Sequence, residues 1–258
     1  MENKNKCGSC NIGYKLMKNG TCIKIENSFT AIYDVKSVNN PTYIMNLKRN
    51  NIKLANIEMY VDNQRVYPYI TYDYQYKIYP EEVFVSHKFK KSGKNIVKII
   101  INQNLTKMQN LFCKCKDLVE VSFSESFDTS NVQSMTEMFF FCESLIKVDL
   151  SSFNTSSVND YTFMFIYADK ITSLDLSNFE GKYSCGFNQM FASAMGLKYI
   201  DISSFYSIYP GCNSLDLYNA PDNGQVIANT KLNGIWTKNW KIIYKNWLKN
   251  SLNLINKI

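Results

Sequence analysis

The segment VQSMTEMFFFCESLIKVDLSSFNTSS, residues 132–157, decides the fold because its pattern occurs three more times, at residues 105–131, 158–184 and 185–208. Equivalent positions are 26 residues apart in the last three copies; between the first two they are 27 apart until an extra residue near Ser124–Ser126 restores the phase. Seven columns of apolar residues or cysteine recur: Leu111/Met138/Met164/Met190, Phe112/Phe139/Phe165/Phe191, Cys115/Cys142/Ala168/Ala194, Leu118/Leu145/Ile171/Leu197, Val121/Val148/Leu174/Ile200, Phe123/Leu150/Leu176/Ile202 and Phe127/Phe153/Phe179/Phe205.

A unit this short cannot bury its apolar face alone, whereas stacked units bury each other's faces in one continuous core. The LxxVxL part of each unit sends alternate side chains inward, as a short strand does. The preceding MFxxC part has apolar residues at helical spacing, so each unit is expected to be a strand plus a short helix or turn. The sequence therefore predicts an α/β solenoid of leucine-rich-repeat type over residues 105–221, with a parallel sheet of short strands. SLDLYNAP, residues 214–221, repeats the sequence motif of the strands and is predicted to form a truncated closing coil.

The repeat wording MFxxCxxLxxLDLSxFNTSxV resembles that of BspA-like leucine-rich-repeat surface proteins of bacteria and protists. The order of a cysteine-rich segment, a β module and these repeats is similar to the order in the protist members. The resemblance implies a location at the cell surface, a role in adhesion or host contact, and no catalysis. The third and fourth units lose the FNTSS turn, which indicates that the array is ending.

Residues 26–104 are predicted to form a small antiparallel β-sandwich, similar to Ig-like or PKD-like modules. Its runs of β-branched and aromatic residues are separated by turn signals such as Asp62-Asn63 and Ser92-Gly93. The expected strands are 29–35, 43–47, 57–61, 83–89 and 96–101, and FKKSGKNIVKIII (89–101) resembles a final hairpin. Tyr72, Tyr74 and Tyr76 alternate onto one strand face, where they form either a sugar- or protein-binding surface or, as we favour, half-buried packing.

Residues 1–25 contain Cys7, Cys10 and Cys22 in the run CGSCNIGYKLMKNGTC, which is too polar to fold without a covalent tie. This run resembles the end of an EGF-like or furin-like module. The resemblance implies a Cys10–Cys22 disulfide and leaves Cys7 to a partner upstream. Zinc bound by the CxxC pair is the alternative. We therefore expect a fragment of a larger extracellular chain whose signal sequence is missing.

The side chains between the inward strand positions are predicted to face solvent and to bind the partner: Lys147, Asp149, Ser173, Asp175, Tyr199 and Asp201. The three aspartates share a column, so they stack as like charges that attract a cation or a basic partner. The alternative is that they are solvated or bonded to neighbouring serines. Cys115 and Cys142 share another column, and we favour buried free thiols there over a disulfide.

The tail, residues 222–258, has six lysines and, from Asn223 on, no Asp, Glu or Arg. One face of a basic amphipathic helix is predicted from Trp240, Ile243, Tyr244, Trp247 and Leu248. This helix either caps the solenoid, as we favour, or lies on an anionic membrane surface. Because the positive charge is concentrated in the tail, the composition does not favour a nucleic-acid partner.

We expect a non-enzyme without cofactor or metal, because His87, the only histidine, lies in the charged run SHKFKK without a nucleophile motif, and is expected at the surface. The expected function is recognition of a protein or glycan on another cell or matrix. The alternatives are a structural coat or spacer protein, and an intracellular leucine-rich-repeat regulator if Met1 is the true start. Asn19, Asn104 and Asn154 lie in glycosylation sequons, as an extracellular location would allow.

Overall fold

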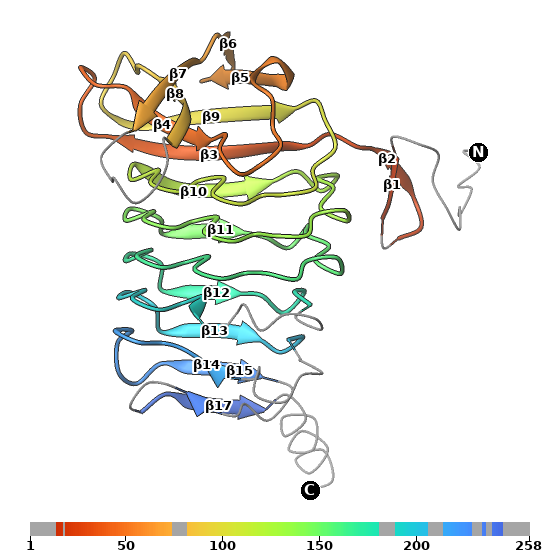
Figure 1. Ribbon diagram of the computed structural model, residues 1–258, viewed down its shortest axis with the longest axis vertical. Helices are drawn as coiled ribbons and strands as arrows, with labels where there is room; N and C mark the ends of the chain where they lie inside the picture. Colours follow the sequence, from red (N-terminus) through yellow and green to blue (C-terminus); the bar gives the residue numbers. More distant parts are fainter. Residues whose placement is uncertain are drawn as a thin grey trace, which may run out of the picture.

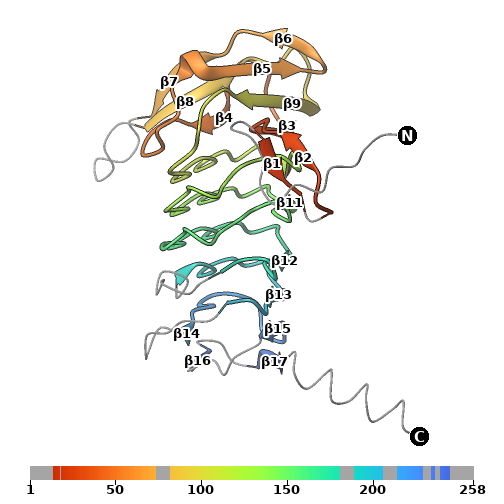
Figure 2. The same cartoon turned by 90° about the vertical axis from the view of Figure 1, so that its right-hand side faces the viewer.

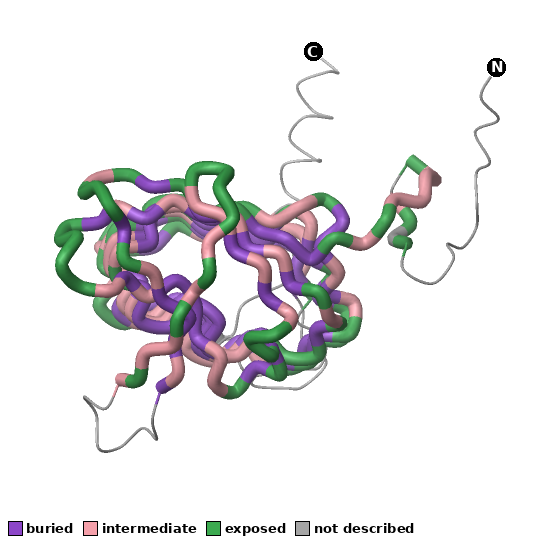
Figure 3. Tube along the Cα trace, turned by 90° about the horizontal axis from the view of Figure 1, so that it is seen from above, coloured by how far each residue is buried: buried purple, intermediate pink, exposed green. Residues whose placement is uncertain are grey.

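The computed structural model describes residues 14–17, 19–73, 82–180, 189–205, 214–228, 234–235 and 239–244. The chain is an elongated stack of coils that carries a layer of antiparallel strands at its N-terminal end (Figures 1 and 2). Seen along the stack, buried residues lie on the inner side of the coils and exposed residues line the rim (Figure 3). One hydrophobic cluster extends from Phe29 in the β layer to Trp240 near the other end.

The β layer contains two sheets. In the first, β3 (Ser28–Val35), β9 (Gly93–Ile101), β5 (Ile57–Val61) and β6 (Gln64–Val66) are antiparallel neighbours in that order. In the second, β8 (Glu82–His87) lies between β4 (Thr42–Asn46) and β7 (Tyr69–Asp73). The five predicted strands are confirmed, with shifted ends. The expected final hairpin is wrong, because β8 and β9 belong to different sheets. The Ig-like or PKD-like type stays a prediction.

The β layer continues directly into the solenoid. Strand β10 (Leu118–Phe123) pairs antiparallel with β3 on one side and parallel with β11 (Lys147–Asp149) on the other. Phe29 is opposite Phe123, and Val121 is opposite Val148. Both the sheet and the hydrophobic core therefore cross the segment boundary at residue 104, and β3 covers the edge of the first coil.

The remaining coils stack their strands in parallel, as predicted. β12 (Ser173–Asp175), β13 (Tyr199–Ile202), β15 (Gln225–Ala228) and β17 (Lys241–Tyr244) form one sheet. Leu174, Ile200, Val226 and Ile242 occupy one inward column across these four strands. Strands β11 and β12 belong to different sheets, so the parallel sheet is interrupted between them.

The predicted helices are absent from the part of the solenoid that the structure describes, so the α/β class is wrong there and the fold is a β-solenoid. The described residues contain no α-helix; the short 3-10 helix η1 (Leu54–Asn56) lies in the β layer, and Gln189 also has 3-10 conformation. The MFxxC segments instead make turns, with positive φ at Asn110 and Lys114 in the first coil and at Glu137 and Phe141 in the second. Alternate N–H groups bond to the next coil, as in Phe112 N to Met138 O at 2.8 Å, and others close turns within the segment, as in Cys115 N to Phe112 O at 3.0 Å.

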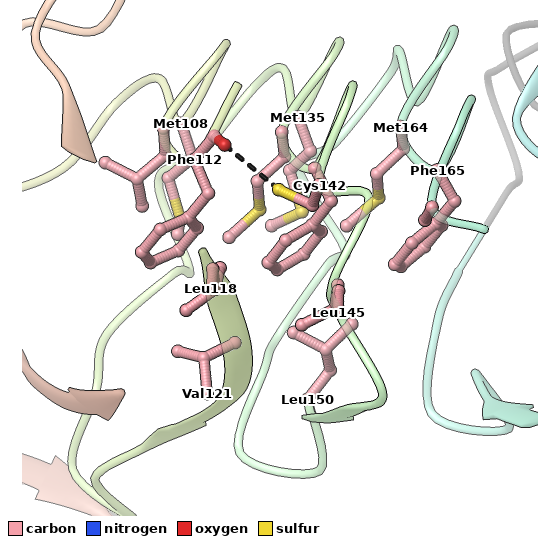
Figure 4. Packing of buried hydrophobic residues seen from close by; sticks show 14 of the residues in the cluster. Met108, Phe112, Leu118, Val121, Met135, Cys142, Leu145, Leu150, Met164 and Phe165 are labelled. Atoms are coloured by element: carbon pink, nitrogen blue, oxygen red, sulfur yellow. Dashed lines mark hydrogen bonds between the residues drawn. The ribbon is translucent and has the colours of Figure 1, made fainter. Parts of the chain in front are cut away.

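The repeat columns form the core, as the sequence predicted. All the column residues are buried except Phe123 and Val148, which are partly buried against the same cluster. Two stacks of phenylalanine rings run along the solenoid. Phe112, Phe139 and Phe165 have centroids 5.4 and 5.3 Å apart and nearly parallel planes (Figure 4). Such offset stacking adds about 0.5–1.5 kcal/mol per pair beyond the area buried.

The closing region differs from the prediction. The strand that pairs with β13 on its C-terminal side is β15. Val226 is opposite Ile200 and lies 26 residues after it in the sequence. SLDLYNAP therefore supplies the turn part of this coil, and Leu217 and Ala220 fall 26 residues after Phe191 and Ala194. Ser214–Leu215 is the short strand β14, parallel to β16 (Gly234–Ile235).

The predicted amphipathic helix is wrong over residues 241–244, which form strand β17. Trp240 is buried, and its indole N–H donates a 2.8 Å hydrogen bond to Pro221 O. The tail up to Tyr244 therefore extends the solenoid by one more strand. Trp247 and Leu248 lie outside the described residues.

Candidate functional site

The six residues predicted to bind a partner lie together on the outer side of the strand sheets. Lys147, Asp149, Ser173 and Asp175 are exposed, and Tyr199 and Asp201 are partly exposed. Tyr199 is opposite Ser173 and Asp201 is opposite Asp175. We call the outward side chains of β3, β10, β11, β12 and β13 the strand face. It contains a hollow of about 130 Å³ lined by Thr30, Ile32, Glu120, Val121, Ser122, Lys147 and Asp149.

Each aspartate of the strand face is held by a hydrogen bond from the backbone two residues later. The Oδ1 atoms of Asp149, Asp175 and Asp201 accept bonds of 3.0, 2.9 and 2.8 Å from the N–H groups of Ser151, Ser177 and Ser203. Hydrogen bonds from Ser151 hold the pKa of Asp149 below its usual range. The expected alternative, bonding to neighbouring serines, is therefore confirmed: these carboxylates close the turn after each strand and still carry charge at the surface.

Tyr199 lies close to two carboxylates of the strand face, those of Asp201 and Asp175. Burial raises the pKa of its phenol, and the carboxylates of Asp201 and Asp175 raise it further. A group that donates hydrogen bonds or carries positive charge fits this part of the face.

A second hollow lies where the β layer meets the turn side of the first coils. We call it the corner pocket; it has a volume of about 250 Å³ and is lined by Glu82, Cys113, Lys114, Glu137, Phe140, Phe141 and Tyr167. The ring of Phe141 stacks on Tyr167 at 4.4 Å and meets Phe140 edge-on at 4.6 Å. All three rings are partly exposed, whereas the rings of the Phe112 and Phe127 columns are buried.

The corner pocket has two buried carboxylates. Glu82 is 3% exposed and accepts a hydrogen bond from the side-chain amide of Asn46. Glu137 is 7% exposed and accepts a 3.0 Å bond from Asn110 Nδ2, with the guanidinium of Arg49 3.7 Å away. The charge of Lys114 is balanced by Asp73 at 3.2 Å.

Cys113 lies between the two carboxylates and Lys114 in the wall of the corner pocket. Burial raises the pKa of its thiol, and the carboxylates of Glu82 and Glu137 raise it further. A neighbouring hollow of about 380 Å³ shares Lys114 and Phe141 with the corner pocket and adds Tyr43, Lys116 and Asp117 among its walls. Sequence reasoning missed these residues because they come from distant segments.

The other predicted residues have varied positions. Tyr72 is exposed on β7, and Tyr74 and Tyr76 lie outside the described residues. His87 is partly buried and packs edge-on against Phe89 at 4.9 Å, so the expected surface position is wrong in part. Burial, followed by the charge of Lys90, lowers the pKa of its imidazole.

Cys115 and Cys142 are free and buried, as expected, and Cys113 is too. Cys113, Cys115 and Cys142 form no disulfide, and Cys142 Sγ donates a 3.0 Å hydrogen bond to Phe112 O (Figure 4). Cys22, in β2 (Cys22–Lys24) beside β1 (Tyr14–Leu16), is disulfide-bonded. Cys7 and Cys10 lie outside the described residues, so the Cys10–Cys22 pairing stays a prediction. Asn19, Asn104 and Asn154 are all exposed.

No group of three or more His, Cys, Asp or Glu side chains in the described ranges is arranged to hold a metal ion. No helix there is long and apolar enough to cross a membrane.

The stacked coils, the ring stacks and the continuous core define the class of protein: a β-solenoid repeat protein. The particular family it resembles is one described as Mycoplasma protein of unknown function, DUF285, whose model matches residues 82–205, a little under half of the chain. The match runs from β8 in the β layer to Phe205 at the end of the fourth repeat unit. It is compatible with the repeat surface proteins that the sequence wording resembles. No curated protein and no solved structure matches the chain.

Proposed function

We propose that this chain is a non-catalytic surface protein that recognises a protein or glycan through its strand face. The observation that carries the proposal is the regular acidic column of Asp149, Asp175 and Asp201, held in place by backbone bonds from the following serines. Side chains that are fixed before binding lose little conformational entropy when a partner is bound. The leucine-rich-repeat, BspA-like assignment and the extracellular location belong to this proposal.

The chemistry of the strand face suggests a partner with positive charge or many hydrogen-bond donors. Asp175 and Asp201 are directly opposite each other on neighbouring strands, and no lysine or arginine pairs with either in the described structure. The hollow at β3, β10 and β11 has a volume of only about 130 Å³, which suits a contact with a surface better than enclosure of a small molecule.

The test is binding of the labelled chain to a glycan array and to immobilised extracellular-matrix proteins. The informative variant is D149N/D175N/D201N, since asparagine accepts the same backbone bonds and removes only the charge. Charge reversal at these positions is less informative, because it also breaks the three turn bonds. We expect the asparagine variant to keep its melting temperature and to lose most of its binding.

The control is a variant of the corner pocket, F141N, which leaves the strand face untouched. If this variant loses binding and the triple asparagine variant keeps it, the strand face is not the recognition surface. If the wild-type chain binds nothing in either panel, the alternative of a structural coat or spacer protein gains support.

A further inference from the structure

The corner pocket combines three features that together suit one kind of ligand. Its outer walls are the partly exposed rings of Phe140, Phe141 and Tyr167. Its other walls include the carboxylates of Glu82 and Glu137, both more than nine-tenths buried. Its volume of about 250 Å³ is below the range of about 300–1,000 Å³ that is usual for drug-sized ligands, so a small group fits it.

Glu82 is the strongest pointer to a cationic ligand. A buried carboxylate is costly unless a cation or several hydrogen-bond donors compensate its charge. Its bond from Asn46 supplies one neutral donor. No lysine, arginine or histidine forms an ion pair with Glu82 among the described residues.

The other charges of the pocket do not neutralise this carboxylate. Lys114 is committed to Asp73, and both side chains are about nine-tenths buried. Arg49 lies 3.7 Å from Glu137 rather than from Glu82, and its side chain is 37% exposed. Counting these five side chains, negative charge exceeds positive charge by one.

The aromatic walls are not required by the backbone. Phe141 and Tyr167 have φ of 57° each, a left-handed conformation that asparagine adopts more easily than a bulky aromatic residue does. The equivalent positions in other coils are Lys114, Ser193 and Asn219, which have φ of 61°, 57° and 61°. The repeat therefore accepts polar residues at this corner, and its backbone conformation does not explain the two aromatic rings.

We propose that the corner pocket binds an organic ammonium cation. The rings of Phe140, Phe141 and Tyr167 contact its alkyl groups and its charge through cation–π interactions, and the carboxylates of Glu82 and Glu137 compensate the charge. This site lies on the turn side of the coils, apart from the strand face, and does not depend on the function proposed above. The ammonium group belongs either to a small quaternary ligand or to a lysine side chain.

The experiment titrates the full chain with choline, with its neutral carbon isostere in which a tert-butyl group replaces trimethylammonium, and with N-acetyl-lysine methylamide. Binding is followed by calorimetry and by the NMR shifts of the aromatic rings. We expect one of the two cations to bind at least roughly tenfold more tightly than the neutral isostere. Tighter binding of choline identifies a quaternary ligand, and tighter binding of the lysine compound identifies a side chain.

Variants separate a binding role from a packing role. F141N and Y167N remove one ring each and suit the left-handed backbone, so we expect the fold to be kept and cation affinity to fall roughly tenfold or more. E82Q keeps an acceptor for the Asn46 amide and removes the charge, and it should weaken the cation but not the isostere. The matched control is D149N/D175N/D201N, which should bind the cation as the wild-type chain does.

Two outcomes would overturn the proposal. One is equal affinity for the cations and the neutral isostere, which would make the pocket merely apolar. The other is the absence of any cation-dependent ring shift in a chain that melts normally. Neither outcome bears on attachment through the strand face, which is measured separately.

Discussion

The indole of Trp240 fills the space that a side chain on Gly224 would need: a Cβ built on Gly224 would lie 2.4 Å from Trp240 Cε2. The same indole donates its hydrogen bond to Pro221 O. Trp240 therefore fastens the last described strand to the coil before it.

We expect Gly224→Ala to lower the melting temperature, because overpacking of this kind costs about 1–3 kcal/mol. The measurement is thermal unfolding of the full chain. The control is a double-mutant cycle with Trp240→Leu. The variant that carries both substitutions should lose less stability than the sum of the losses in the two single variants. Additive losses would mean that Gly224 and Trp240 do not contact each other.

Leu174→Asp should unfold the solenoid, since it places a charge in the inward column that Leu174 shares with Ile200 and Val226. Leu174 is 2% exposed. Ser173→Asp introduces the same group one residue earlier, at an exposed position, and should leave the fold intact. Circular dichroism and thermal melting compare the two. Equal melting of both variants would show that the inward and outward registers are wrong.

Asp169→Asn should stabilise the chain at neutral pH. Burial raises the pKa of the Asp169 carboxyl, and its Oδ1 is buried without a hydrogen-bond partner within the described structure. The folded state therefore holds this proton more tightly than the unfolded state does, so stability is lost as pH rises through the interval between the two pKa values. Asparagine is uncharged and removes the free-energy cost of burying the ionised carboxylate.

The pH dependence of melting checks this explanation. The gain from Asp169→Asn should be present at neutral pH and should disappear below the ordinary pKa of aspartate, where the carboxyl is protonated in both states. A gain that is the same at acid and neutral pH would contradict the linkage and indicate a packing effect instead.

Alkylation of the native chain should leave Cys113, Cys115 and Cys142 unmodified, because burial raises the pKa of all three thiols and the thiolate is the reactive form. Denaturation should expose them. Peptide mapping without reduction should find Cys10 joined to Cys22. A Cys115–Cys142 bond in that map would be inconsistent with the buried free thiols of the structure.

The core of the solenoid was predictable from the sequence because its columns repeat at a constant interval, and periodic burial requires no knowledge of distant contacts. The turns were not predictable by the same reasoning. The spacing of Leu111, Phe112 and Cys115 suits one helical turn, but the left-handed residues Asn110 and Lys114 break the helix and direct N–H groups to the next coil. Because these bonds join residues about one repeat apart, local spacing does not reveal them.

The closing coil was misassigned because residues 214–217 resemble the strand motif of the repeats but do not form the next strand of the parallel sheet. SLDL at residues 214–217 has the letters of a strand, but the 26-residue interval from Ile200 leads to Val226. The 26-residue spacing therefore predicts the strand position better than the similarity of the residues does. The strand face was predictable from alternation, whereas the corner pocket joins Glu82 of the β layer to Phe140, Phe141 and Tyr167 of two coils, and only tertiary structure brings these together.

Strand β3 crosses the top of the solenoid in the opposite direction to the coils, and this has a consequence for how such arrays lengthen. A parallel coil offers its successor an edge of the same polarity, so coils can be added one after another. An antiparallel strand paired with β10 removes that edge at the N-terminal end. A second copy of the chain therefore finds no matching edge there on which to stack, and end-to-end fibre growth is blocked at that end. Duplication of coils between β10 and β17 would change the length of the array without altering the strands that cover its N-terminal end.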